Sequence, residues 1–159
     1  MSLKVRRVVT GHDEQGRAKV LIDETTTNVM SPRPGAEFSV IWMTEGFPIS
    51  NEDSADPSHK KIGTTLPNGS VFRIVSFGPG VAPRNHRTDS IDYAVVISGA
   101  IEMHLDDGVV VKLKAGDVLV QRGTIHNWVN PNGEPCVIAF VLISAKPVSA
   151  GGARLDAVG

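Results

Sequence analysis

The sequence predicts an all-β fold built from antiparallel strands. Segments of alternating or β-branched apolar residues recur along the whole chain, with turn residues between them. Sixteen glycines and ten prolines among 159 residues suit many short strands joined by tight corners. No segment has the pattern of a long amphipathic helix. Many antiparallel strands without helices form either a sandwich or a closed barrel.

Each strand is assigned from its apolar alternation and from the turn residues that bound it. The sequence DDG at 106–108, between two alternating runs, is typical of a hairpin turn, and NPNGEP at 130–135 is typical of another turn. The apolar run CVIAFVLI is typical of a central strand. The expected strands cover residues 4–9, 18–22, 37–44, 71–77, 91–97, 101–105, 109–113, 117–121, 125–130 and 136–143.

The length suits a single domain that spans residues 1–159 and contains one sizeable core. Residues 45–70 interrupt the strand pattern, because they are polar and rich in Gly, Pro, Asn and Asp. A loop of this length either covers a binding site or is an ordinary surface excursion. The small residues of the tail, SAGGARLDAVG, are expected to fray or to pack on a partner subunit.

The composition excludes several classes of protein. A net charge of −1, with scattered Lys and Arg, predicts no binding to nucleic acid or to an anionic membrane. No apolar run approaches the roughly 20 residues that span a bilayer, and the N-terminus lacks a signal-peptide pattern. The single cysteine, Cys136, cannot form an internal disulfide and is expected to be a buried core residue. These features predict a cytoplasmic protein.

Two segments carry most of the chemical information. The first runs from Gly80 to Gly99 and the second from Gly116 to Asn130. They supply His86, Asp92 and His126 from strand-like sequence. Two neutral imidazoles and a carboxylate can form a divalent transition-metal site. They can equally form the polar floor of a small-molecule pocket.

These segments resemble the two motifs of the cupin superfamily, most closely over residues 71–143. In the first motif, Gly80, His86, Asp92 and Gly99 occupy matching positions. In the second, Gly116, His126 and Asn130 match, although the interval from the glycine to the histidine is one residue short. The resemblance implies an antiparallel jelly-roll β-barrel, the cupin fold. It leaves the function open, because cupins include dioxygenases, decarboxylases, isomerases, storage proteins and regulators.

The sequence differs from the cupin motifs at positions that usually hold the metal in this family. Thr88 stands where the second metal-binding histidine usually stands, and Asp92 replaces a glutamate with a shorter acid. Arg122 occupies the proline position of the second motif. The resemblance implies that His86, Asp92 and His126 hold a divalent transition metal (zinc, iron, nickel or manganese). The departures predict modest affinity and incomplete occupancy.

Strand alternation suggests which other side chains enter the cavity. Asp92 shares a face with Ala94 and Val96, and if it faces inward it acts as a metal ligand, as a partner that orients a histidine or as a general base. Arg73 lies on the same face of its strand as Val75 and Phe77. If this face points inward, Arg73 recognises an anionic ligand; otherwise it lies on a solvated face. The remaining candidate ligand-binding residues are Thr88, Arg122 at the mouth and Trp128, which shares parity with His126.

We therefore expect a small-molecule-binding cupin and hold two classes of function open. The first is a metal-assisted enzyme, of dioxygenase or decarboxylase type, acting on a small anionic organic compound. The second is a metal-free protein with the same pocket, either a ligand-binding or sensing module or an isomerase that uses a histidine as base. No catalytic residue can be assigned from the sequence. Because open strand edges must be covered, we also expect a homodimer.

Overall fold

The computed structural model describes residues 2–52 and 55–159, and this part of the chain is almost entirely β-structure. The prediction of an all-β protein is confirmed, and each expected strand overlaps an observed one. In chain order the elements are β1 (Arg6–His12), β2 (Ala18–Thr25), β3 (Val29–Arg33), β4 (Ala36–Glu45), β5 (Gly69–Phe77), β6 (Ser90–Ser98), β7 (Ala100–His104), the 3-10 turn η1 (Asp106–Gly108), β8 (Val110–Lys114), β9 (Val118–Arg122), β10 (Asn127–Val129), β11 (Cys136–Ser144), β12 (Val148–Ala150) and β13 (Ala153–Leu155).

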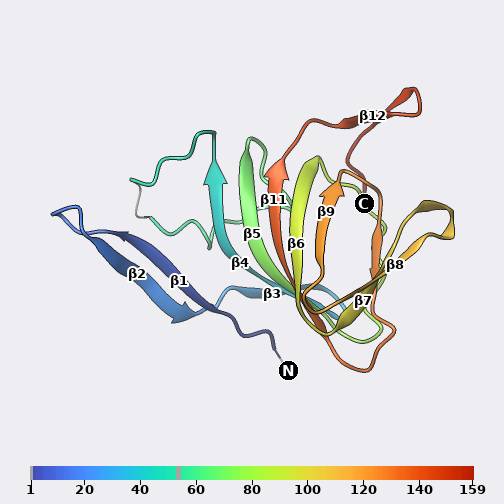
Figure 1. Cartoon of the computed structure of the whole chain (residues 1–159), viewed down its shortest axis with the longest axis horizontal. Coiled ribbons are helices and arrows are strands. Elements are labelled where there is room, and N and C mark those ends of the chain that lie inside the picture. The colour runs from blue at the N-terminus through green and yellow to red at the C-terminus, as the bar shows by residue number, and fades with distance from the viewer. Residues whose placement is uncertain (1, 53–54) are drawn as a thin grey trace.

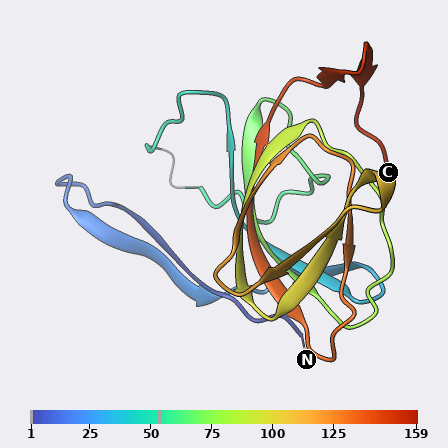
Figure 2. The ribbon, with the colours of Figure 1, turned by 45° about the vertical axis from the view of Figure 1, so that its right-hand side comes forward.

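The strands form two principal sheets. The larger has the order β3-β4-β5-β11-β6-β9 and the smaller the order β10-β7-β8, with all neighbours antiparallel. The two sheets curve around a common interior, and the β1–β2 hairpin extends away from them (Figures 1 and 2). The interior between the two sheets therefore holds both the core and any cavity.

The core follows from side-chain alternation along the central strands. Along β11, every second residue from Cys136 to Leu142 is buried while its neighbours are only half-buried. Along β6, the buried residues alternate with exposed ones in the same way. Successive side chains of a strand point to opposite faces, so one face of each strand packs inward. The main cluster consists of Ala36, Phe77, Val81, Ala94, Val96, Ile101, Met103, Trp128, Cys136, Ile138, Phe140 and Leu142.

Three observed strands have no clear signal in the sequence. The strand β3 contains Pro32 and lies at the edge of the larger sheet, where a missing N–H costs no ladder bond. The strands β12 and β13 form a hairpin around Gly151 and Gly152, which both have positive φ. Of the two expectations for the tail, fraying is therefore wrong for residues 149–155, because this turn lets the tail pair with itself; packing on a partner subunit stays a prediction.

The chain after β13 returns to the barrel (Figure 1). Arg87 and Val158 form an isolated antiparallel bridge, with N–H to O distances of 2.9 and 3.0 Å. The last residues thus lie against the segment that carries His86.

The long segment between β4 and β5 contains no strand or helix in its described part. Buried Arg7 of β1 anchors it, since its guanidinium pairs with Asp56 of this segment and with Glu24 of β2. The same guanidinium donates to the carbonyl oxygen of Ile41 in β4 at 3.0 Å. This anchoring connects the hairpin, the long segment and the barrel.

Two residues of the predicted motifs have structural roles. Asn130 is almost fully buried, and its side-chain nitrogen donates to the carbonyl oxygens of Phe77 and Glu134 at 2.8 and 2.9 Å. It thereby ties the turn before β11 to the end of β5. Gly99 has a φ of +76°, and a Cβ there would collide with the Pro135 carbonyl oxygen. Only glycine suits this position.

Among the described residues, no helix is both long enough and apolar enough to cross a membrane.

Candidate functional site

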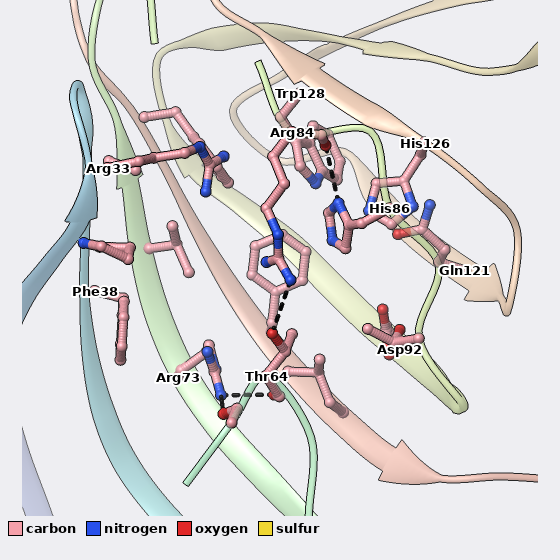
Figure 3. A pocket seen from close by; sticks show the side chains of 18 of the residues that line it. Arg33, Phe38, Thr64, Arg73, Arg84, His86, Asp92, Gln121, His126 and Trp128 are labelled. Carbon is pink, nitrogen blue, oxygen red and sulfur yellow. Dashed lines mark hydrogen bonds between the residues drawn. The ribbon is translucent and has the colours of Figure 1, made fainter. Parts of the chain in front are cut away.

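A cavity of about 430 Å³ lies inside the barrel and contains most of the predicted site residues. Six of the seven line it: Arg73, His86, Thr88, Asp92, His126 and Trp128. Figure 3 shows Arg73 on one side of this space and Asp92 and the two histidines on the other. The lining is completed by Met30, Pro32, Arg33, Ala36, Phe38, Ile62, Gly63, Thr64, Val75, Phe77, Arg84, Gln121, Phe140 and Leu142.

Arg122 lies outside this cavity. It is exposed at the end of β9, whereas the preceding residue, Gln121, is buried and lines the cavity. The two adjacent residues point to opposite faces of the sheet, as strand alternation requires. Gln121 is directly opposite Asp92 in the β6–β9 register. The sequence analysis missed it, although strand alternation along β9 is the signal that could have found it.

The two histidines are joined through their backbones. Each donates its N–H to the carbonyl oxygen of the other at 3.0 Å, which forms an isolated antiparallel bridge between the two motif segments. The ring centroids of His86 and His126 are 4.2 Å apart. Both side chains are more than nine-tenths buried. Two residues 40 positions apart in the sequence (126 − 86) thus form one pair in the cavity wall.

Backbone carbonyls determine the tautomer of both rings. The Nδ1 atom of His86 is 3.0 Å from the Arg84 carbonyl oxygen, and Nδ1 of His126 is 2.9 Å from that of Thr124. A carbonyl oxygen can only accept, so each Nδ1 carries a hydrogen. In the neutral ring the lone pair is then on Nε2.

Burial keeps both rings neutral. Removal from water lowers the pKa of His86, and the nearby Arg84 charge adds to this effect. Burial lowers the pKa of His126 to about 4, with a further contribution from His86. A buried imidazole loses solvation of its charged form and therefore titrates at lower pH. At neutral pH the pair presents two uncharged Nε2 acceptors.

Asp92 belongs to a chain of hydroxyl groups on β6 and the segment before it. The hydroxyl of Ser90 donates to Oδ1 of Asp92 at 2.6 Å, and the Thr88 hydroxyl is 2.9 Å from that of Ser90. Burial raises the pKa of Asp92, while the Ser90 hydrogen bond and the Arg73 charge oppose the increase. The two positions that depart from the cupin metal motif, Thr88 and Asp92, are thus linked to one another through Ser90.

This arrangement does not fit a cupin metal ion. Within residues 2–52 and 55–159, no three His, Cys, Asp or Glu side chains are placed to hold one ion. The structure brings the imidazoles of His86 and His126 together but does not bring Asp92 into the same ligand set. A structural or catalytic transition-metal site normally uses at least three protein ligands.

Three arginines give the cavity a positive character. Arg33, Arg73 and Arg84 line it, and none has a carboxylate within ion-pair distance among the described residues. With neutral imidazoles, these three charges and Asp92 give the lining a formal charge of 3 − 1 = +2. A positive lining opposes a metal cation and favours an anionic ligand.

Arg73 is the most deeply buried of the three arginines. Its Nη2 donates to the carbonyl oxygens of Gly63 and Thr64 at 3.1 and 2.6 Å, and the guanidinium carbon lies 5.0 Å from the Phe38 ring centroid. Its Nε is buried without a hydrogen-bond partner in the described part of the chain. Burial lowers the pKa of Arg73 to about 10, which leaves it charged at neutral pH.

Arg33 and Arg84 carry less conspicuous sequence signals. Arg84 donates to the Thr64 hydroxyl at 3.2 Å and to the Gly159 carbonyl oxygen at 2.9 Å. It precedes His86 by two residues, so the extended parity of that segment was the available signal. Arg33 donates to the Ala82 carbonyl oxygen at 2.9 Å. It follows Pro32 on an edge strand, and no pattern in the sequence indicated that it enters the cavity.

The comparisons with known proteins agree with this architecture. A family model described as a cupin domain matches residues 73–143. The chain is 33% identical, over 160 residues, to the cupin-domain-containing oxidoreductase fogC of Aspergillus ruber, covering 96% of this chain and 79% of that protein. It is 35% identical, over 160 residues, to phomopsin biosynthesis cluster protein C' of Diaporthe leptostromiformis, covering 96% and 85%.

The chain is a cupin. The predicted family membership is confirmed, as is the antiparallel jelly-roll fold. Among solved structures, the cupin domain of Cnp3 from Schizosaccharomyces pombe matches with a TM-score of 0.52 and 12% identity over 89% of each chain. This similarity supports the fold alone.

Acidification should destabilise this cupin through His126. Its folded pKa is about 4, whereas the ordinary value is 6.5, so between these values the unfolded chain binds the proton and the folded chain does not. The free energy of unfolding should fall as pH decreases through this window, by on the order of 3 kcal/mol. Urea denaturation measured across the window tests this. The free energy of unfolding should depend less steeply on pH in His126→Gln than in the wild type. The control His104→Gln, whose ring lies outside the cavity, should keep the wild-type dependence. The same pH dependence in wild type and His126→Gln would contradict the assignment.

Metal titration tests the ligand set directly. Because only two imidazoles meet, calorimetry with zinc or nickel should show no stoichiometric binding to the wild type. Thr88→His adds a third imidazole at the cavity wall and should raise the affinity at least about tenfold. Thr65→His, which does not line the cavity, is the control. One ion bound per wild-type chain, with binding lost in His126→Ala, would establish the metal site that the motif resemblance implies.

Proposed function

We propose that this cupin is a metal-independent enzyme that binds a small organic anion in its barrel and moves a proton on it. The observation that carries the proposal is the pairing of two neutral imidazoles with three arginines that lack carboxylate partners among the described residues. Its relatives include proteins named as cupin-domain oxidoreductases and as members of a biosynthesis cluster. These names support an enzyme-like role in small-molecule chemistry.

The arginines provide recognition. Arg73 and Arg84 present guanidinium groups to the same cavity, and a carboxylate or phosphate can accept two parallel hydrogen bonds from such a group. Binding of an anion also raises the pKa of the two histidines, because a nearby negative charge stabilises the protonated imidazole. Ligand binding would therefore bring the pair closer to the range in which a base is effective near neutral pH.

The imidazole pair provides the chemistry. Nε2 of His86 or His126 accepts a proton from a carbon or oxygen of the ligand, and the surrounding arginines disfavour a lasting imidazolium. The proton is then returned to a different atom of the ligand. One proton leaves and one is delivered, so the net reaction is an isomerisation that needs no oxidant and no metal. This corresponds to the metal-free isomerase among the functions expected from the sequence.

Two other functions give different outcomes in the same assay. Cavity-binding compounds are incubated with the protein in D₂O and followed by NMR. Deuterium entering the ligand, with loss of exchange in the His86→Gln, His126→Gln double variant, supports the proposal. A ligand that binds and returns unchanged indicates a binding or sensing module. Consumption of O₂ would indicate the redox chemistry in the names of the relatives.

Arg73 should be decisive for anion binding. Replacing it with Met keeps much of its bulk but removes the charge and the unpartnered Nε, so binding of carboxylate ligands should weaken by more than about tenfold. Quenching of the fluorescence of Trp128, which lines the cavity, provides the measurement. Arg122→Met, outside the cavity, is the matched control. Unchanged affinity in Arg73→Met would place the anion elsewhere.

We also propose a homodimer in the cytoplasm. Cys136 is the only cysteine and is a free buried thiol, as suits a reducing compartment. The outer face of the larger sheet carries an apolar row in register across β4, β5, β11, β6 and β9, shown side by side in Figure 1. The row consists of Trp42, Phe72, Val141, Tyr93 and Val120.

The apolar row favours a second copy of the same chain as its partner. Phe72, Tyr93 and Val120 are 37%, 49% and 57% exposed, and Val95 and Val118 extend the patch. A contiguous uncharged patch of this kind is typical of an interface, and a self-complementary face closes as a two-fold dimer.

Light scattering should give a mass near twice 16.9 kDa for the wild type. The mass should fall to that of one chain in Tyr93→Lys with Val120→Lys. Val109→Lys, at an equally exposed valine in the β7–β8 turn, should leave the dimer intact. A single-chain mass for the wild type at every concentration would exclude the dimer.

A further inference from the structure

The unpaired polar atoms of the cavity describe the chemical class of the substrate. This inference rests on the proposed function and deepens it. Four buried side-chain atoms have no hydrogen-bond partner in the described part of the chain, and two of them, Nε of Arg73 and Oε1 of Gln121, belong to cavity-lining residues. A buried polar group without a partner destabilises the folded state, because it has lost its hydrogen bonds to water. A ligand that pairs with both atoms removes this destabilisation.

The two unpaired atoms require opposite hydrogen-bonding groups on a ligand. Nε of Arg73 is a charged donor and needs an acceptor, for which an anionic oxygen is best. Oε1 of Gln121 is an acceptor and needs a donor. The Gln121 side-chain nitrogen faces the Met103 sulfur at 3.5 Å and the Thr124 hydroxyl at 3.4 Å, which leaves Oε1 without a donor.

Arg73 and Gln121 belong to different walls of the cavity. Arg73 lies on β5 and Gln121 on β9, and Figure 3 shows them on opposite sides of the space, with the histidines next to Gln121. The Nε2 atoms of His86 and His126 are further acceptors on the Gln121 side. One side of the cavity therefore donates to an anion, and the other accepts from hydroxyl groups.

An apolar aromatic surface also lines the cavity. Trp128 stacks on Phe77 with ring centroids 5.7 Å apart and meets Phe140 edge-on at 5.9 Å. Phe38, Val75 and Leu142 add to this lining. Aromatic side chains prefer offset-stacked or edge-to-face contact with another ring. The middle of the cavity thus suits a planar, apolar body.

We propose that the substrate is a hydroxylated aromatic carboxylic acid. Its carboxylate pairs with Arg73, its ring packs between Phe38 and the Phe77–Trp128–Phe140 surface, and a ring hydroxyl donates to Oε1 of Gln121. The cavity of about 430 Å³ is within the range of small-molecule sites. Gln121 is then a specificity-determining residue, and the hydroxyl is held beside the imidazole Nε2 atoms that accept a proton.

A comparison of four probes tests this class. Benzoate, 3-hydroxybenzoate, 4-hydroxybenzoate and 4-methoxybenzoate share the carboxylate and the ring. They differ in the ring substituent, and only the two hydroxybenzoates carry a hydrogen-bond donor. Binding is measured by Trp128 fluorescence and checked by calorimetry. At least one hydroxybenzoate should bind the wild type roughly five- to tenfold more tightly than benzoate, as a single neutral hydrogen bond allows. The methoxy compound, which adds bulk without a donor, should show no such gain.

A variant of Gln121 tests whether this residue causes the higher affinity for hydroxybenzoates. In Gln121→Leu the hydroxybenzoate-to-benzoate affinity ratio should fall close to one, because Leu has no acceptor for the ring hydroxyl. Gln15→Leu, at the other glutamine and outside the cavity, should keep the wild-type ratio. Arg73→Met should weaken all four probes alike.

The outcomes separate the two proposals. The hydroxylated class is wrong if benzoate binds and neither hydroxybenzoate binds more tightly. It is also wrong if Gln121→Leu still binds a hydroxybenzoate more tightly than benzoate. In both cases the proposal of anion binding stands. If 4-methoxybenzoate gains as much as its hydroxy analogue, the contact is packing and the role of Gln121 is refuted. If none of the acids binds the wild type, the proposed anion-binding function fails, and this inference fails with it. The probe comparison needs only the wild-type protein, so it holds even if a variant misfolds.

Discussion

The antiparallel backbone bridge between His86 and His126 is the interaction on which the site depends. Its two hydrogen bonds join the first motif segment to the second and bring the imidazole centroids within 4.2 Å. Because the backbones are held, each Nδ1 meets a carbonyl of its own segment and each Nε2 is left without a hydrogen. The pairing of the two backbone segments thus determines the tautomer of each imidazole, and the tautomer leaves Nε2 free to accept a proton or a hydrogen bond.

Charge around this pair selects what the cavity can hold. Three guanidinium groups enter the same space, and no described carboxylate forms an ion pair with any of them. A cation would be repelled there, and each imidazole is neutral because its charged form loses solvation. The substituted motif positions reinforce this, since Thr88 and Asp92 are connected through Ser90. These features support the proposed anion site.

Recognition and chemistry then share one set of walls. Arg73 on β5 lies opposite Gln121 and the histidines (Figure 3), and aromatic side chains of the core line the same cavity. The core packing that closes the barrel also holds the rings of Phe77, Trp128 and Phe140 in position. Any ligand that fills the cavity therefore contacts the hydrophobic core, so binding should stabilise the fold as well as orient the ligand.

The sequence by itself predicted most of the strands and the motif residues, because alternation is a local property of each strand. It assigned Arg73, Asp92 and Trp128 each to one face of a strand, but only the structure decided that this face points inward. It also matched Gly99 to the first motif, and the structure shows that this residue has a positive φ. It misjudged the end of β9, where Arg122 was expected at the mouth and Gln121 enters instead, since the turn at Gly123 obscured the strand parity. Only the tertiary structure decided that Asp92 turns to Ser90 rather than joining the imidazoles, and that Arg33 and Arg84 complete the charge. These contacts join residues from separate segments, and their geometry depends on register and barrel closure, which no local pattern encodes.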